Sequence, residues 1–178
     1  MANRESLRAF QSRLAGRLQA ARSTGVSASW LAVEAGDARY LFPLGHAGEI
    51  FPWTHPAPVP YTQPWFLGVA NLRGGLYGVV QWSTFATGGR SAVAVTEAPG
   101  AQSRLVALNE LLEVNCALQV DRLIGLRGVE AFTDATAPDA EALGWMGHAY
   151  FDAEGVRWQE VNLQALSQQP EFLGIGAA

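Results

Sequence analysis

From residue 30 onward, apolar and polar residues alternate in short runs that are interrupted by glycine, proline and aspartate. Alternation with a period of two is typical of strands that bury one face. "WLAVEAGDARYLFPL" holds two such runs around Gly36-Asp37, which indicates a hairpin. The other runs that predict strands are "EIFPW", Phe66–Val80, "SAVAV", "RLVAL", "LLEV", "ALQVDRLIGL", "HAYFD" and "VRWQEV". Because no helices alternate with these strands, the pattern predicts an all-β fold of small antiparallel barrels.

Breaks in the pattern predict how the strands are connected. Five of the nine prolines lie between Pro52 and Pro64, which indicates a stiff, extended crossing loop. The strands divide approximately at 88–90, where two glycines interrupt the chain, and 152–155 is predicted to be a hairpin turn. A short helix is predicted over Leu163–Gln168, with Asn162 as its N-cap.

Residues 1–25 follow a helical pattern instead, and we treat them as a segment separate from the domain 26–178. Apolar residues recur at three- and four-residue steps: Leu7, Phe10, Leu14, Leu18 and Ala21. The remaining positions carry five arginines against one glutamate, so this helix is basic and amphipathic. One interpretation is that its apolar stripe packs on the protein's own strands. The other is that it binds a partner or a membrane surface.

Charge and composition exclude several classes of protein. The net charge of -4 argues against a general nucleic-acid binder, which needs a basic surface for phosphates. All twelve basic residues are arginine, so the chain has no P-loop lysine, no Schiff-base lysine and no receiver-type lysine. There is no apolar run approaching 18 residues and no leader pattern, which predicts that the chain does not insert in a membrane. A single cysteine, Cys116, excludes an internal disulfide and suits a reducing compartment, so we expect a cytoplasmic protein.

Residues that carry catalytic chemistry do not form a recognisable site. The histidines His46, His55 and His148 have no metal-ligand spacing, and neither a nucleophile elbow nor a dinucleotide fingerprint is present. We therefore expect no enzymatic activity, no metal and no cofactor. Carboxylates that converge from distant strands remain an open alternative, because one sequence does not reveal them.

Six tryptophans contribute to a core or to an interface. Trp30, Trp145 and Trp158 lie in apolar runs and are predicted to be core residues. The other three, Trp53, Trp65 and Trp82, flank the proline-rich loop and the Arg73 segment. For these three, both a core and an interface position remain open, with the core favoured.

Arg73 stands out because it is the only formally charged residue between Ile50 and Gly89. The following Gly74-Gly75 predicts a tight turn, so the arginine is expected at the rim of a barrel. An arginine within neutral, aromatic surface is typical of an interface hot spot. An internal ion pair with Glu49 is the alternative, and such a pair would still leave guanidinium donors facing outward.

Several of these segments resemble the CheW-like family of chemotaxis adaptor domains. The specific block is "EIFPWTHPAPVPYTQPWFLGVANLRGGLYGVV", which contains Glu-Ile, a loop ending in proline, then Asn-Leu-Arg-Gly and a Val-Val strand. "SRLVALNELLEVNCALQVDRLIGL" and "WMGHAYFDAEGVRWQEVNLQALSQQPEFL" are similar to the family's later hairpins and terminal helix. The resemblance is strongest to the branch that serves type IV pilus systems (PilI-type proteins), in which an arginine-rich N-terminal helix is usual.

The resemblance implies two small five-stranded SH3-like barrels around a shared core, and a scaffold without enzymatic activity. It implies two partners: the regulatory domain of a chemotaxis-type histidine kinase and the cytoplasmic tip of a methyl-accepting chemoreceptor, in membrane-associated arrays that control twitching motility. The family's partner-binding positions correspond to Asn71, Leu72, Arg73, Gly74 and Glu49.

Two positions depart from the family pattern, because Gln81-Trp82 and Asn162-Leu163 replace the usual Asp-Leu. Each keeps a polar side chain that suits a cap or turn, so we expect the fold to persist, with a dedicated partner set. Two other functions remain open. One is a modulator that binds the kinase without coupling it to a receptor. The other is a small-barrel protein that binds a ligand between its barrels.

Overall fold

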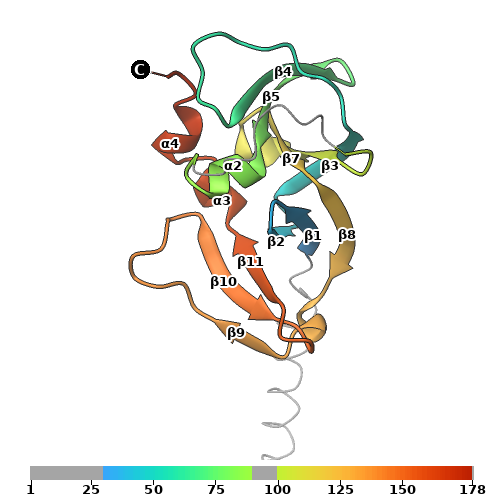
Figure 1. The fold of residues 1–178 in the computed structure, drawn as a ribbon, viewed down its shortest axis with the longest axis vertical. Coiled ribbons are helices and arrows are strands. Elements are labelled where there is room, and N and C mark those ends of the chain that lie inside the picture. Colours follow the sequence, from blue (N-terminus) through green and yellow to red (C-terminus); the bar gives the residue numbers. More distant parts are fainter. Residues whose placement is uncertain (1–29, 90–99, 178) are drawn as a thin grey trace, which may run out of the picture.

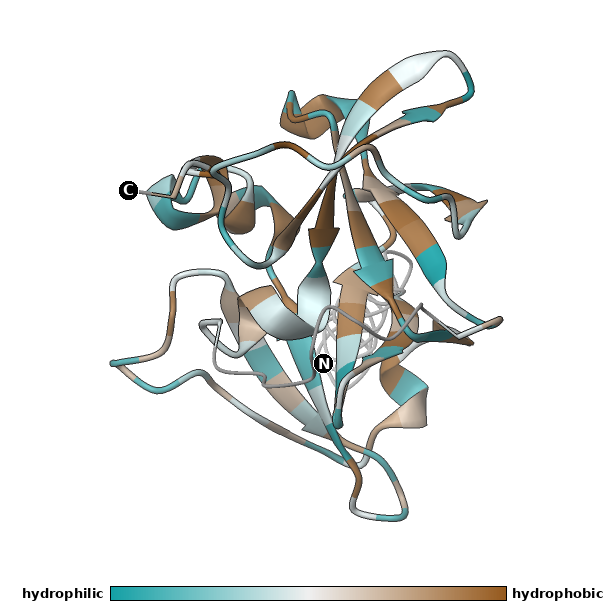
Figure 2. Ribbon diagram, turned by 45° about the horizontal axis from the view of Figure 1, so that its top comes forward, coloured by the Kyte–Doolittle hydropathy of each residue, from teal (hydrophilic) through white to brown (hydrophobic). Residues whose placement is uncertain are grey.

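The computed structural model describes residues 30–89 and 100–177, which form two curved sheets with a few short helices (Figure 1). The predicted helix over 1–25 and the predicted strand "SAVAV" lie outside the described residues. Along several strands, apolar and polar residues alternate, which Figure 2 shows as brown and teal blocks, whereas Trp30–Ala35 and Cys116–Val120 are buried on both faces. The prediction of a mostly β fold is therefore confirmed.

The six-stranded sheet takes its strands from both ends of the described chain. Its strands are β1 (Trp30–Ala35), β2 (Ala38–Pro43), β8 (Arg122–Arg127), β9 (Asp134–Thr136), β10 (Met146–Phe151) and β11 (Arg157–Val161). They lie in the order β8-β1-β2-β11-β10-β9. The β1–β2 hairpin turns at Gly36-Asp37 as predicted. All neighbours are antiparallel except β2 and β11, which pair in parallel.

The five-stranded sheet is built from the middle of the chain. Its strands are β3 (Ala47–Pro52), β4 (Phe66–Leu72), β5 (Gly75–Gln81), β6 (Arg104–Leu108) and β7 (Cys116–Val120), in the order β3-β6-β7-β5-β4. The predicted antiparallel pattern holds except between β5 and β7, which are parallel. The proline-rich loop covers the edge strand β4, because Ala57 and Val69 exchange two backbone hydrogen bonds of 2.7 and 2.9 Å.

Short helices fill the space beside the sheets. They are α2 (Trp82–Ala86), α3 (Leu163–Leu166) and α4 (Pro170–Leu173), with 3-10 turns η1 (Glu110–Leu112) and η2 (Val129–Ala131). Asn162 caps α3 as predicted, since its Oδ1 accepts a 2.9 Å hydrogen bond from the amide of Ala165. Gln81 precedes α2 without capping its backbone, and its side chain accepts from the hydroxyl of Thr84 at 2.6 Å.

One apolar cluster joins the two sheets. It includes Val33 and Phe42 from the six-stranded sheet and Val106 and Leu118 from the five-stranded sheet, with Trp82 between them. Each sheet also curves around a smaller cluster of its own. In the five-stranded sheet this inner cluster holds Phe51, Ala70, Leu72, Val79, Leu105, Ala107 and Ala117, and in the other it holds Trp30, Ala32, Leu41 and Trp158. The expected arrangement, two small barrels around a shared core, is confirmed, with six strands in one sheet where the resemblance implies five.

The tryptophans lie mainly in these clusters. Trp30, Trp145 and Trp158 are buried as predicted. Trp65 and Trp82 are also buried, while Trp53 is half-buried against the inner cluster of the five-stranded sheet. Of the three whose position the sequence leaves open, two are core residues.

The structure differs from the sequence-based expectations in several segments. "LLEV" is not a strand, because η1 and the left-handed Glu113 (φ +55°) interrupt it. The strand β9 and the helices α2 and α4 were not predicted. The sheets also do not separate at 88–90, since β5 and β6 on either side belong to the same sheet. The reason is that the chain passes from one sheet to the other between β2 and β3 and returns between β7 and β8.

Candidate protein-binding site at the Arg73 turn

The Arg73 turn is a two-residue hairpin loop between β4 and β5. Leu72 pairs with Gly75, so Arg73 and Gly74 form the loop, one residue earlier than the two glycines suggest. Both have positive φ, +49° and +86°, which is the type I′ geometry that matches the twist of a hairpin. The side chain of Asn71 supports the turn, because its Oδ1 accepts a 2.9 Å hydrogen bond from the amide of Gly74.

Positive φ is unusual for arginine. A non-glycine residue in the left-handed region is strained by about 1–3 kcal/mol, and such residues concentrate at functional sites. The side chain of Arg73 is 75% exposed, so the strained backbone conformation does not serve to bury this side chain in the core. The turn instead presents the guanidinium to solvent at the end of the hairpin.

Glu49 on β3 pairs with Arg73, which is the alternative that the sequence left open, with 2.5 Å between its Oε1 and Nη1 of the arginine. Both side chains are substantially exposed, so this pair contributes little net stability. It does fix the direction of the guanidinium, whose other N–H donors remain for a partner. It also links β3 at one edge of the five-stranded sheet to the hairpin at the other edge.

The remaining sequence-predicted residues take different positions. Asn71 and Gly74 are exposed at the turn, whereas Leu72 is only 5% exposed and packs inside the barrel with Phe51 and Val79. Leu72 therefore supports the turn from within. The turn geometry brings the other four positions together on the surface.

Two exposed apolar residues that adjoin these positions along β3 and β5 were not predicted as site residues. Leu76 lies opposite Asn71 on the hairpin and is 62% exposed, and Ile50 follows Glu49 on β3 and is 39% exposed. Their signal in the sequence was their position, since Leu76 follows Arg73 by three residues and Ile50 follows Glu49 directly. We call Asn71, Arg73, Gly74, Glu49, Ile50 and Leu76 the Arg73 surface. A charge flanked by exposed apolar side chains is typical of protein interfaces.

Cys116 is the only cysteine of the chain, and its side chain is buried. Burial raises the pKa of the Cys116 thiol to about 12, so this side chain stays a neutral thiol at physiological pH. Within residues 30–89 and 100–177, no three side chains of the metal-binding types gather at one place. No helix in the same ranges is long and apolar enough to cross a membrane.

The sequence profile of the CheW-like domain matches residues 29–147, which is more than half of the chain. The chain belongs to the CheW-like family. This confirms the resemblance seen in the sequence, and the Arg73 surface lies within the matched part of the CheW-like domain.

Two known proteins are similar to this chain. It is 28% identical over 165 residues to Protein PilI of Pseudomonas aeruginosa, covering 92% of this chain and 88% of that protein. The predicted similarity to PilI-type proteins is therefore confirmed. The scaffolding protein TtCheW from Thermoanaerobacter tengcongensis has a similar structure, with a TM-score of 0.59 over 76% of this chain and 89% of that one. Their sequence identity is 12%, so this likeness concerns the fold alone.

Proposed function

We propose that this protein is a non-catalytic adaptor that couples a chemoreceptor to a histidine kinase in a chemotaxis-like pathway controlling type IV pilus twitching motility. The observation that carries the proposal is the CheW-like match over residues 29–147. The similarity to PilI over most of the chain supports the pilus pathway. The adaptor would act in the cytoplasm, at receptor arrays in which weak contacts are strengthened by repetition.

The Arg73 surface is the proposed contact with one of these partners. Its guanidinium is held by Glu49 and carried on a strained turn, and both features orient it without burying it. A carboxylate of the partner would accept hydrogen bonds from the free N–H groups, and Ile50 and Leu76 would bury apolar area beside it. Leu72 has a supporting role in this proposal, because it packs inside the barrel.

The test is binding of the purified chain to the regulatory domain of the cognate kinase and, separately, to the receptor tip, by calorimetry. The wild-type chain should bind both. Arg73→Glu should weaken binding to one partner at least tenfold, about 1.4 kcal/mol, because it removes the donors and adds a like charge. Binding to the other partner should be unchanged.

A charge-swapped double variant, Glu49→Arg with Arg73→Glu, separates contact from support. It keeps an ion pair across the barrel but moves the positive charge to β3. If Arg73 contacts the partner, the double variant stays as weak as Arg73→Glu alone. Recovery of binding would instead assign the pair a structural role. A wild-type chain that binds only the kinase would be a modulator rather than an adaptor, and one that binds neither partner would contradict the proposal.

A further inference from the structure

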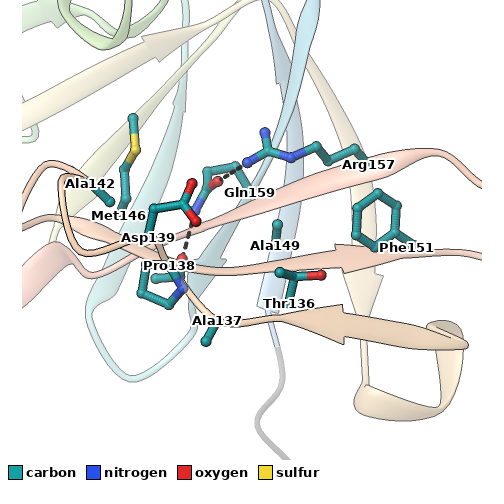
Figure 3. A pocket seen from close by; sticks show the side chains of 11 residues that line it. Thr136, Ala137, Pro138, Asp139, Ala142, Met146, Ala149, Phe151, Arg157 and Gln159 are labelled. Atoms are coloured by element: carbon teal, nitrogen blue, oxygen red, sulfur yellow. Dashed lines mark hydrogen bonds between the residues drawn. The ribbon is translucent and has the colours of Figure 1, made fainter.

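A small hollow lies on the six-stranded sheet, under the loop that joins β9 to β10 (Figure 3). Its volume is about 230 Å³. Adjacent strands form its floor, since Thr136 and Gln159 both pair with Ala149, and Arg157 pairs with Phe151. The loop residues Pro138, Asp139 and Ala142 form the opposite wall. The inner cluster around Trp158 is a separate set of side chains.

Arg157 is oriented toward this hollow by a buried amide. Gln159 is 5% exposed, and its Nε2 donates to the carbonyls of Gly147 and Glu160, both at 2.9 Å. These two bonds fix the amide, so its Oε1 is left to accept a 2.7 Å hydrogen bond from Arg157. Throughout the described ranges, Arg157 has no carboxylate within 4.0 Å. Its guanidinium is therefore held in place with most of its donors unused.

Asp139 brings the opposite charge to the same hollow. Asp139 and Arg157 both line the hollow, and in Figure 3 the Asp139 carboxylate overlaps the Gln159 amide to which Arg157 is bonded. The two charges do not form an ion pair with each other, and Asp139 pairs with no other cation among residues 30–89 and 100–177. The hollow therefore has one carboxylate and one guanidinium that do not pair with each other. A single ligand that carries both a positive and a negative charge could bind both groups.

We propose that this hollow is a binding site for a small zwitterion of the α-amino-acid class. Its carboxylate would accept hydrogen bonds from Arg157, and its ammonium group would lie against Asp139. Met146, Ala149 and Phe151 also line the hollow and provide apolar surface for an aliphatic side chain. The volume lies below the range of roughly 300–1,000 Å³ that is usual for drug-sized ligands, which favours a small ligand.

This site is independent of the proposed adaptor function. It lies on β9, β10 and β11, whereas the Arg73 surface lies on β3, β4 and β5 at the other end of the molecule in Figure 1. Binding of a small zwitterion and binding of a protein partner are therefore separate measurements on separate surfaces.

The test is a titration of the full ¹⁵N-labelled chain with glycine, L-alanine and L-leucine, each followed by the backbone amide signals of Gly147 and Ala149. At least one of the three should shift these signals saturably. Two analogues match L-leucine in shape: 4-methylpentanoate lacks the ammonium group, and 3-methylbutylamine lacks the carboxylate. Each should bind at least tenfold more weakly than L-leucine, because each leaves one protein charge without a partner.

Substitutions identify the two charges. Arg157→Gln and Asp139→Asn should each weaken binding at least tenfold, and both positions are exposed, so the variants should fold. Arg104→Gln is the matched control, since it removes an arginine whose Nη1 donates to the carbonyls of Ala101 and Ser103, outside this hollow. It should leave binding unchanged.

Three results would overturn the proposal. The first is that none of the three amino acids produces a saturable shift. The second is that 4-methylpentanoate binds as tightly as L-leucine, which would make the site a carboxylate site without a role for Asp139. The third is that Arg104→Gln weakens binding as much as Arg157→Gln, which would reduce the effect to overall charge.

Discussion

At the scale of single residues, Arg73 occupies a backbone conformation that its side chain does not favour. Asparagine and glycine are the usual residues at the first position of a type I′ loop, because both tolerate positive φ. The exposed guanidinium contributes little to the stability of the fold, because its ion pair with Glu49 is open to solvent. Arginine at this position therefore indicates a requirement other than stability.

Arg73→Asn should raise the free energy of unfolding by about 0.5–1 kcal/mol, because asparagine relieves part of the strain at φ +49°. The same variant should bind the proposed partner more weakly. Urea denaturation measures the first effect. Glu49→Gln is the control, since it removes the ion pair without altering the turn, and it should change stability by no more than about 1 kcal/mol. A less stable Arg73→Asn would show that the arginine itself holds the turn.

Part of this site could be predicted from the sequence. The pairing of Arg73 with Glu49 was one of two interpretations of the sequence, because Glu49 is the nearest acid before the arginine, and the structure contains this pair. The residues of the turn did not, because glycines indicate that a turn exists without showing which residues enter it. Here the hydrogen bond from the Gly74 amide to Asn71 accompanies a turn that begins at Arg73.

At the scale of elements, the proline-rich loop forms a single β-bridge to β4, the edge strand of the five-stranded sheet. Its contact with β4 is very close at Gly68, where φ is +131° and an added Cβ would lie 2.1 Å from the carbonyl oxygen of Ala57. Only glycine allows this approach. The loop thereby covers an edge that would otherwise expose unpaired backbone groups.

Gly68→Ala should destabilise the protein more than Gly125→Ala. Gly125 has nearly the same φ, +136°, but nothing lies within 4 Å of its added Cβ. The strain in φ should cost each variant about 1–3 kcal/mol. The clash with Ala57 should cost Gly68→Ala roughly 1–3 kcal/mol more, since backbone must shift. Thermal melts of both variants measure the difference, and equal losses would mean that the loop moves away freely.

The sequence predicts mainly the strands whose apolar and polar residues alternate regularly. One predicted strand is wrong and one strand was not predicted, and each difference has a physical reason. In "LLEV", Asn109 accepts a hydrogen bond from the amide of Leu111 and begins a 3-10 turn, so Leu111 is exposed although it is apolar. The strand β9 has three exposed residues and no apolar face, and it exists because it pairs with β10. The parallel pairs join strands that are far apart in sequence, which local patterns do not report.

At the scale of the whole molecule, the shared cluster makes the two sheets depend on each other. Trp82 is fully buried at its centre and contacts Tyr40 and Phe42 from β2 as well as Trp145. Neither sheet buries these side chains alone. We therefore expect the described domain to unfold as a single cooperative unit.

Trp82→Ala should lower the free energy of unfolding by roughly 3–5 kcal/mol, because it leaves a large cavity in the shared cluster. Hydrogen exchange should then accelerate together at Leu41 of β2 and Leu118 of β7, which lie in different sheets. Trp53→Ala is the control, since Trp53 is half-buried outside this cluster, and its effect should be smaller. Faster exchange in one sheet alone would contradict the cooperative unit.

The parallel pairing of β2 with β11 has a consequence for how the protein is made. Tyr40 of β2 pairs with Gln159 of β11, so the centre of the six-stranded sheet joins segments from opposite ends of the described chain. On the ribosome, β1 and β2 emerge long before β11 is synthesised. All strands of the five-stranded sheet have been synthesised by residue 120, whereas the six-stranded sheet is complete only after β11, which ends at residue 161. Folding of the complete domain is therefore a late step in synthesis. Until β11 is available to pair with β2, the β1–β2 hairpin has an unpaired edge that is prone to aggregation.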